Sequence, residues 1–218
     1  MRALRIALPN GVLLPDACAL LESAGVARLD PASFTKSLRV ADHGNDFVML
    51  RPTDVPVYVE LGACECGIVG KDVLWETERE CYELVDLGFG TCRLVLAAPA
   101  DSPLAAGVWP PSLRVATKYP RAANRFLHRL GVAAELIKLH GSVELAPATG
   151  LADAVCDLTA TGRTLRANHL VEIADAGTST ARLIANQAAL KTRDIDINAL
   201  ATALRRAVGS RAAAKGAA

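Results

Sequence analysis

The sequence predicts an α/β fold in which largely parallel strands are covered by helices. Hydrophobic residues make up 51% of the chain, which is enough for a substantial core, but aromatic residues make up only 4%. The interior is therefore expected to consist of Leu, Val, Ile and Ala, as in parallel sheets with helices on both faces. Short apolar runs also alternate along the chain with segments of helical spacing, which favours right-handed βαβ units.

The first part of the chain begins with a short apolar strand that ends at Pro9-Asn10-Gly11. A second strand ends at Arg51-Pro52. The helix after it tolerates Pro56, because N–H groups in the first turn of a helix have no intrahelical partner. Gly88-Phe89-Gly90 separates the last two strands of this part. The predicted strands are 4–8, 47–50, 66–69, 82–86 and 92–97, and the predicted helices are 12–23, 54–61 and a short one that ends at Trp75.

A cluster of prolines with Gly107 in residues 98–112 separates a second α/β part. In its closing helix, Leu200, Leu204 and Val208 repeat at intervals of four and form one apolar stripe. The tail 210–218 consists mainly of small residues and is predicted to be disordered. The predicted strands of this part are 113–116, 134–139, 154–156, 171–174 and 181–186, and the predicted helices are 121–130, 144–149, 164–167 and 195–208.

Charge and hydropathy argue against several classes of protein. The chain has 24 basic and 23 acidic residues, so its net charge of +1 gives no electrostatic signature of a nucleic-acid or membrane partner. The sequence has no apolar run long enough to span a membrane, and its first residues lead directly into a strand rather than a signal peptide. We therefore expect a soluble, cytoplasmic protein.

The six cysteines are expected to be buried and to form no disulfides. They are scattered through an α/β chain without a signal sequence, a setting in which disulfides are uncommon. Cys64-Glu65-Cys66 is the only close pair, and a single C-x-C without a second pair of ligands is a weak metal signal. The sequence thus predicts no metal site, and cysteines that behave as small hydrophobic residues.

The stretch 153–165 is the clearest candidate for a binding site. A short apolar run passes into hydroxyl-rich residues and Gly162, and a helix-forming segment begins at Thr164. Where a strand turns into a helix, backbone N–H groups lack partners and the helix dipole is positive, so a phosphate can bind without lysine. The hydroxyls of Thr159, Thr161 and Thr164 can donate hydrogen bonds to phosphate oxygens.

Two carboxylates beside this turn point to a sugar. Asp153 and Asp157 would repel a phosphate, so neutral hydroxyls such as those of a sugar are more favourable partners. Together with the turn, they indicate a sugar phosphate. The alternative is purely structural, because threonine and glycine after a buried strand also form an ordinary helix cap, and aspartates often cap turns.

Three long stretches resemble a known enzyme family. They are Ala116-Thr117-Lys118-Tyr119-Pro120, residues 137–147 and residues 150–170. Shorter matches are 51–56, 67–74 and 182–186, so the resemblance runs in order through nearly the whole chain, from Arg5 to Gln187. On these residues the chain resembles the catalytic subunit of ATP phosphoribosyltransferase, the enzyme that opens histidine biosynthesis.

The resemblance implies a two-lobed fold. The family has two α/β lobes of the periplasmic-binding-protein type (type II), built on mixed, largely parallel sheets, with a ligand cleft between the lobes. Since the chain would cross between the lobes twice, the first lobe is expected to be discontinuous. It would take residues 1–91 and 178–218 and form the ATP and pyrophosphate side, while 92–177 would form the phosphoribosyl side. Clefts between domains are common small-molecule sites.

The resemblance also implies a reaction. Phosphoribosyl pyrophosphate would transfer its ribosyl group to N1 of the adenine of ATP and release pyrophosphate. Asp153, Asp157 and Glu144 would be catalytic, because carboxylates stabilise the oxocarbenium character that develops at C1. Mg²⁺ would arrive bound to the phosphates of the substrates. The residues that would bind the 5′-phosphate are Thr159, Ala160, Thr161, Gly162, Arg163 and Thr164.

In the first lobe, the resemblance assigns ATP and pyrophosphate to the ends of strands, where sites in α/β proteins concentrate. A structural alternative stays open for Glu144, Lys71 and Asp72, because charged residues are also common at ordinary helix starts. The residues that would bind ATP and pyrophosphate are Asn10, Gly11, Lys36, Arg51, Lys71 and Asp72.

The chain departs from the family pattern at its first glycine turn. The family usually has Pro-Lys-Gly-Arg there, whereas this chain has Pro9-Asn10-Gly11-Val12 and so lacks both cations. Each lost cation that stabilises the leaving group would raise the barrier by about 2–4 kcal/mol, unless Lys36, Lys71 or Arg51 compensates. Arg39 is a further candidate for this compensation. The alternative function is therefore a weakened or repurposed paralog, which binds a nucleotide or sugar phosphate as a regulatory subunit.

The length of the chain resembles that of the short forms of the family. Long forms carry an additional histidine-binding domain, whereas short forms assemble with a separate regulatory subunit that resembles histidyl-tRNA synthetase. The resemblance thus implies a homodimer within a hetero-oligomer.

Overall fold

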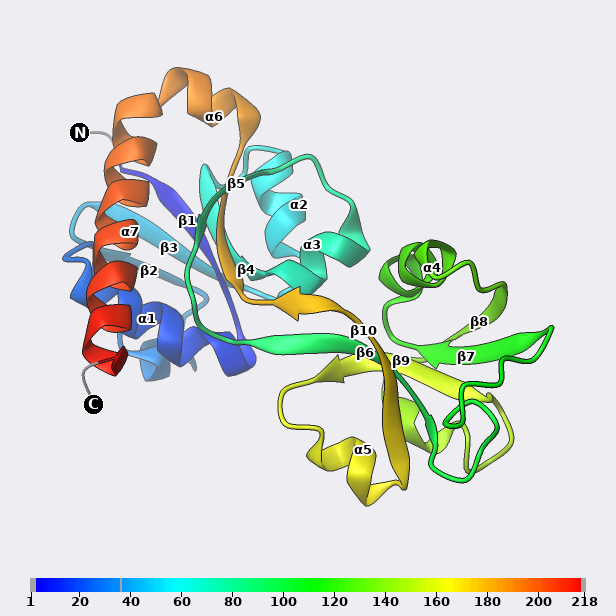
Figure 1. The fold of residues 1–218 in the computed structure, drawn as a ribbon. Coiled ribbons are helices and arrows are strands. Elements are labelled where there is room, and N and C mark those ends of the chain that lie inside the picture. The colour runs from blue at the N-terminus through cyan, green and yellow to red at the C-terminus, as the bar shows by residue number, and fades with distance from the viewer. Residues whose placement is uncertain (1–2, 36, 217–218) are drawn as a thin grey trace. The chain divides into compact units, whose positions relative to one another are not determined.

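The computed structural model describes residues 3–35 and 37–216. The chain divides into two compact units (Figure 1). The first unit comprises Met1–Gly90 together with Thr180–Ala218, and the second comprises Thr91–Ser179. No helix in the described ranges is both long enough and apolar enough to cross a membrane.

The first unit is built on a six-stranded mixed sheet with the order β2-β3-β1-β4-β11-β5. Strand β1 pairs in parallel with both β3 and β4, so the parallel strands form the centre of the sheet. Strand β2 on one side, and β11 and β5 on the other, join by antiparallel pairing. The strands are β1 (Arg5–Pro9), β2 (Arg39–Asp42), β3 (Asn45–Leu50), β4 (Cys66–Gly70), β5 (Tyr82–Asp86) and β11 (Ala181–Ala185).

Helices cover both faces of this sheet, as the aliphatic composition predicts (Figure 1). Helices α1 (Leu14–Ser23) and α7 (Asp194–Gly216) contribute to the larger core, while α2 (Val55–Glu60) and α3 (Lys71–Thr77) contribute to the smaller one. A side chain at Gly67 of β4 would lie 2.8 Å from Val55 of α2, so glycine allows this helix to approach the sheet. The remaining helical segments are η1 (Gly11–Leu13), η2 (Pro31–Thr35) and α6 (Gln187–Thr192).

The second unit is built on a five-stranded sheet with the order β10-β6-β9-β7-β8. Strand β7 pairs in parallel with β8 and β9, whereas β6 pairs antiparallel with β9 and β10. The strands are β6 (Cys92–Pro99), β7 (Leu113–Thr117), β8 (Ala134–Lys138), β9 (Ala154–Thr159) and β10 (Leu170–Ser179), and the helices are α4 (Pro120–Arg129), η3 (Val143–Leu145) and α5 (Arg163–Ala167).

The mixed α/β architecture is as predicted, although parallel pairing is less frequent than expected. Among the described residues, four strand pairings are parallel and five are antiparallel. Sequence periodicity missed β2 and α6. Both are short, and β2 is an edge strand whose residues alternate between exposed and half-buried.

The prediction of a disordered tail from residue 210 is wrong for the residues that the structure describes. Helix α7 continues through Gly216, because alanine is the strongest helix former and the tail contains Ala212, Ala213 and Ala214. Residues 217 and 218 lie outside the described part of the chain.

The cysteines form no disulfide within the described part of the chain, as predicted, and they are mostly buried. Cys81 and Cys92 are half-buried, and the other four are buried. Burial raises the pKa of Cys66 and of Cys156 to about 12, so both thiols stay protonated and behave as small apolar side chains.

Candidate active site

The second unit contains a hollow where β9 leaves the sheet. Its volume is 270 Å³, and the stretch identified from the sequence supplies most of its walls. Because β7, β8 and β9 are parallel, their carboxyl ends meet at one edge of the sheet, where ligand sites of α/β proteins usually lie. The lining residues are Glu144, Val155, Asp157, Leu158, Thr159, Ala160, Thr161, Arg163, Thr164 and Leu165.

The turn between β9 and α5 is held rigidly by its own residues. The buried Thr159 accepts a hydrogen bond from the Gly162 amide at 2.8 Å, through its side-chain hydroxyl. Gly162 has φ +69, and a side chain there would lie 2.8 Å from the Arg166 guanidinium. That guanidinium donates to the Thr161 carbonyl oxygen at 2.8 Å. The positive φ therefore favours glycine at this position, and the two hydrogen bonds define the shape of the turn.

Several donors of this turn face the hollow. Thr161, Arg163 and Thr164 line it with exposed side chains. The first amides of α5 have no partner within the helix, which leaves them available to an anion. Of the six residues predicted to bind a phosphate, Gly162 alone does not line the hollow, and its role is to shape the turn.

Asp157 and Glu144 both line this hollow. Burial raises the pKa of Asp157, and the Glu144 carboxylate raises it further. The Leu158 amide and the ammonium group of Lys118 act in the opposite direction and lower this pKa. The hollow thus places two carboxylates beside a turn that is rich in hydrogen-bond donors.

Sequence reasoning missed Lys118, although it lies in the quoted stretch 116–120. A usable signal was the position of this lysine one residue after a short buried strand. In a parallel sheet, such a residue lies at the same edge as the end of β9.

Asp153 does not belong to this hollow, which corrects the prediction that it faces the same ribose as Asp157. It directly precedes β9 and lies four residues before Asp157. At the rise per residue of a strand, this separation corresponds to roughly 13 Å. The Asp153 carboxylate accepts hydrogen bonds from Arg114 Nη2 at 2.8 Å and from the Arg114 amide at 2.9 Å. These hydrogen bonds lower the pKa of Asp153. Asp153 lines a separate, largely apolar hollow of 580 Å³, together with Arg114.

In the first unit, the predicted residues lie along the carboxyl edge of the sheet. Pro9 and Leu50 are paired in the register of β1 and β3, so Asn10 and Arg51 follow at adjacent positions. The Asn10 amide donates to the Leu50 carbonyl oxygen at 2.8 Å. Gly11 has φ +81 and open space around it. The hydrogen bond from Asn10 thus joins the start of the turn to the end of β3.

The departures of this turn from the family pattern leave it without a cation of its own. Val12 is 90% exposed, at a position where the family usually has arginine. Arg51, at the end of the neighbouring strand, is also exposed and supplies a positive charge nearby. Lys36 lies outside the described residues.

Lys71 and Asp72 begin α3, directly after the buried strand β4. The Lys71 ammonium group forms an ion pair with Glu83 of β5. The Asp72 carboxylate lies so close to Gly70 that a side chain at Gly70 would collide with it. Because β4 is parallel to β1, both residues lie at the same edge as Asn10.

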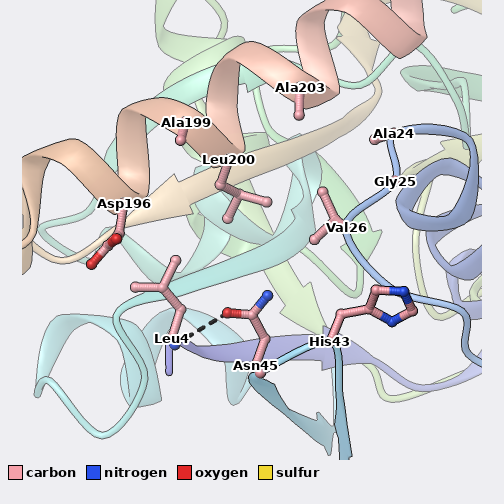
Figure 2. A pocket seen from close by; sticks show the side chains of 11 residues that line it. Leu4, Ala24, Gly25, Val26, His43, Asn45, Asp196, Ala199, Leu200 and Ala203 are labelled. Carbon is pink, nitrogen blue, oxygen red and sulfur yellow. Dashed lines mark hydrogen bonds between the residues drawn. The ribbon is translucent and has the colours of Figure 1, made fainter. Parts of the chain in front are cut away.

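A further hollow in the first unit, of 390 Å³, lies apart from every described residue with a predicted role. Figure 2 shows Leu4, Val26 and Leu200 forming its apolar part, with Ala199 and Ala203 of α7 above them. The Asn45 side chain accepts a hydrogen bond from the Leu4 amide at 3.2 Å, drawn as the dashed line in Figure 2. Within residues 3–35 and 37–216, no group of three or more His, Cys, Asp or Glu side chains is arranged to hold a metal ion.

Two mixed α/β units, the first made of two separate chain segments, define a protein with the periplasmic-binding-protein fold. The aliphatic sulphonate binding protein SsuA of Escherichia coli aligns with a TM-score of 0.62 over 99% of this chain and 76% of SsuA. The two sequences are 14% identical, so this likeness concerns the fold alone.

Within that class, the chain belongs to the ATP phosphoribosyltransferase family. The family model HisG: ATP phosphoribosyltransferase matches residues 51–206. The ATP phosphoribosyltransferase of Rubrobacter xylanophilus is 49% identical over 203 residues, which cover 92% of this chain and 94% of that enzyme. A structure described as the ATP phosphoribosyl transferase (HisG:HisZ) complex from Thermotoga maritima aligns with a TM-score of 0.81 at 29% identity, over 95% of this chain and 99% of that one.

Proposed function

We propose that this protein transfers the phosphoribosyl group of phosphoribosyl pyrophosphate to N1 of the adenine of ATP. The products are phosphoribosyl-ATP and pyrophosphate, and the reaction is the first step of histidine biosynthesis. The observation that carries the proposal is the hollow at the end of β9, where a turn of hydrogen-bond donors adjoins Asp157 and Glu144. This hollow lies inside the region that matches the family model.

The turn suits the 5′-phosphate of the ribose. The hydroxyls of Thr161 and Thr164 and the amides at the start of α5 donate to the phosphate oxygens. Arg163 adds a positive charge at the rim. The hydrogen bond from the Gly162 amide to the Thr159 hydroxyl keeps these donors in place. A phosphate bound in this turn would anchor the sugar beside the two carboxylates.

Asp157 and Glu144 act at the reacting carbon. Adenine N1 forms a bond to C1 of the ribose with its own lone pair, while the bond from C1 to the pyrophosphate oxygen breaks. Positive charge develops at C1 during this exchange, and the two carboxylates stabilise it electrostatically. No general base is needed, because N1 carries no proton that must be removed. Asp153 takes no part in this chemistry, since Arg114 holds it at the other end of the strand.

The carboxylates of Asp157 and Glu144 are compatible with Mg²⁺ that arrives bound to the substrates. Two carboxylates in one hollow provide hard oxygen ligands, but too few of them for a complete cage. When bound, the ion would neutralise the charge of the phosphates. In the first unit, we assign the binding of ATP and pyrophosphate to Asn10, Gly11, Arg51, Lys71 and Asp72. We assign the same role to Lys36, which lies outside the described residues, on the basis of the sequence alone.

The protein works in the cytoplasm, as a homodimer within a hetero-oligomer that contains a HisZ-like regulatory subunit. Support comes from the 43–49% identity to curated relatives whose lengths it nearly covers, and from the Thermotoga maritima HisG:HisZ complex. The alternative of a repurposed, inactive paralog arose from Asn10 and Val12. Neither the fold nor the comparisons favour it.

The direct test is an assay of the pure protein with ATP, phosphoribosyl pyrophosphate and Mg²⁺, with and without the HisZ-like subunit. We expect phosphoribosyl-ATP, and its absence under both conditions would refute the proposal. A paralog that only binds ligands would show binding by calorimetry without turnover. The double variant Asn10→Lys with Val12→Arg measures how far the missing cations limit the rate.

A further inference from the structure

Lys71, which we assign to ATP and pyrophosphate, is bound to a carboxylate of its own unit. Its ammonium group forms an ion pair with Glu83 of β5, twelve residues further along the chain. The sheet brings the two together, because Glu83 pairs with Ile184 of β11, and β11 also pairs with β4, which ends just before Lys71. Ile184 lies in the core cluster that contains Val73 of α3, so Glu83 projects to the side of the sheet that α3 covers.

The backbone of Lys71 is held in place, whereas its side chain is accessible. The Lys71 amide donates a hydrogen bond to the Thr180 carbonyl oxygen at 3.0 Å. The side chains of Lys71 and Glu83 remain 26% and 32% exposed, so dissolved anions reach the pair. An ion pair with this exposure contributes little to the stability of a protein. A strongly charged ligand is therefore able to break it.

Strand β5 supplies one carboxylate to each of two cations at this end of the first unit. Asp86, at the end of β5, pairs with the Arg182 guanidinium at 3.0 Å, and Glu83 pairs with Lys71. Both cations are thus neutralised by the same strand. An anion that approaches Lys71 meets a neutralised cation, and the adjacent Glu83 carboxylate repels it.

We propose that Glu83 competes with phosphate for Lys71, so that pyrophosphate or the phosphate chain of ATP binds Lys71 by displacing Glu83. The inference deepens the proposed function and rests on it for the identity of the ligand. Glu83 lowers the affinity of the first unit for phosphates and returns to Lys71 when pyrophosphate leaves, which promotes release of this product. The same competition limits how far Lys71 replaces the cations missing at Asn10 and Val12.

Isothermal titration calorimetry of the pure protein with inorganic pyrophosphate, in the absence of Mg²⁺, tests this inference without any assay of activity. In Glu83→Gln we expect pyrophosphate to bind about threefold to tenfold more tightly, because Lys71 loses its competing partner and a repulsive charge is removed. Glu83→Asp keeps the charge and should keep an affinity close to that of the wild type.

The matched control is Glu80→Gln. Glu80 is also exposed and lies three residues before Glu83, so the control removes the same charge from the same part of the unit. Its affinity for pyrophosphate should equal that of the wild type. An equal gain in Glu80→Gln would overturn the inference, because net charge alone would then explain the effect. No gain in Glu83→Gln, or no binding in either protein, would also overturn it. Glu83→Ala serves the same purpose if the glutamine variant folds poorly.

The double variant Lys71→Met with Glu83→Gln separates competition for Lys71 from general repulsion. Without Lys71, the change at Glu83 should tighten pyrophosphate binding much less than it does in the wild type. A gain of the same size in both backgrounds would contradict the competition. In kinetics, the inhibition constant of pyrophosphate should fall in Glu83→Gln by the factor that calorimetry gives. A wild-type protein without turnover would refute the proposed function, whereas calorimetry would still decide the role of Glu83.

Discussion

The two ends of strand β9 carry one aspartate each, and the two carboxylates have opposite environments. Before the strand, Asp153 accepts hydrogen bonds from the side chain and the amide of Arg114, and these lower its pKa. Near the carboxyl end, Asp157 faces a hollow in which burial and Glu144 raise its pKa. The first carboxylate is paired with a guanidinium, whereas the second lies in a hollow beside a like charge.

This difference teaches how to distinguish a structural aspartate from a functional one. Both residues flank the same apolar run, and both looked suited to a sugar when the sequence alone was considered. A carboxylate that already accepts several hydrogen bonds from an arginine has less capacity left for a ligand. A carboxylate whose charge is disfavoured by burial and by a like charge gains most when a substrate brings positive charge, which supports the role proposed for Asp157.

The largest difference between the two ends should appear in activity. Asp157→Asn removes the charge that we propose acts at C1, and we expect kcat to fall about 100-fold or more. Asp153→Asn removes a charge of equal size at the other end and should leave kcat close to that of the wild type, measured well below the melting temperature. Equal losses in both variants would mean that the two ends form one functional unit.

The glycines on either side of β9 allow a second comparison of the two ends of this strand. Gly162 has φ +69 and Gly150 has φ +72, so alanine at either position incurs a similar backbone cost of about 1 kcal/mol. A side chain at Gly162 would also lie 2.8 Å from the Arg166 guanidinium, whereas Gly150 has open space around it. We expect Gly162→Ala to raise the KM for phosphoribosyl pyrophosphate about tenfold. Gly150→Ala serves as the control, and a similar rise in KM there would contradict a specific role of the turn.

Asp153 should matter for stability rather than for catalysis. Its pKa is lowered in the folded protein from the ordinary value of 3.8, so its stabilisation is present above that value and is lost as the pH falls through the folded pKa. Asp153→Asn should therefore lower the melting temperature by a few degrees at pH 7. The difference from the wild type should shrink in acid, and a constant difference across this range would exclude the ion pair as its cause.

Substitution of Asp157 should have the opposite effect on stability, and this effect should be the smallest of those predicted for the two ends of β9. Its pKa is raised above 3.8 in the folded protein, so its charge destabilises the fold above the folded pKa and has no such effect below 3.8. Asp157→Asn should thus be slightly more stable than the wild type at pH 7, with no advantage in strong acid. Thermal unfolding at both pH values measures this, and a less stable variant at pH 7 would show that the charge is well accommodated.

Sequence reasoning predicted the turn well because its elements are local. A buried strand, threonines and a glycine before a helix start are read from adjacent residues, and Gly162 does adopt the left-handed conformation that such a turn needs. Asp157 was predicted for the same reason. Local patterns also explain why the edge strand β2, which has little apolar character, was missed.

Asp153 and Lys118 were misjudged because their roles depend on residues far away in the chain. The partner of Asp153 is Arg114, which lies 39 positions away, and only the pairing of β7 with β9 brings the two together. The same pairing brings Lys118 beside Asp157. A sequence shows that each strand exists, but the register that sets these neighbours is a property of the folded sheet.

We propose that the carboxyl end of β9, and not its beginning, holds the phosphoribosyl group. Backbone ¹⁵N–¹H NMR with phosphoribosyl pyrophosphate and Mg²⁺ tests this most directly, since each end contributes assignable amides. We expect large chemical-shift changes for Thr161, Gly162 and Thr164, and small ones for Gly150 and Asp153. Large changes at Gly150 and Asp153, with none in the turn, would contradict the claim.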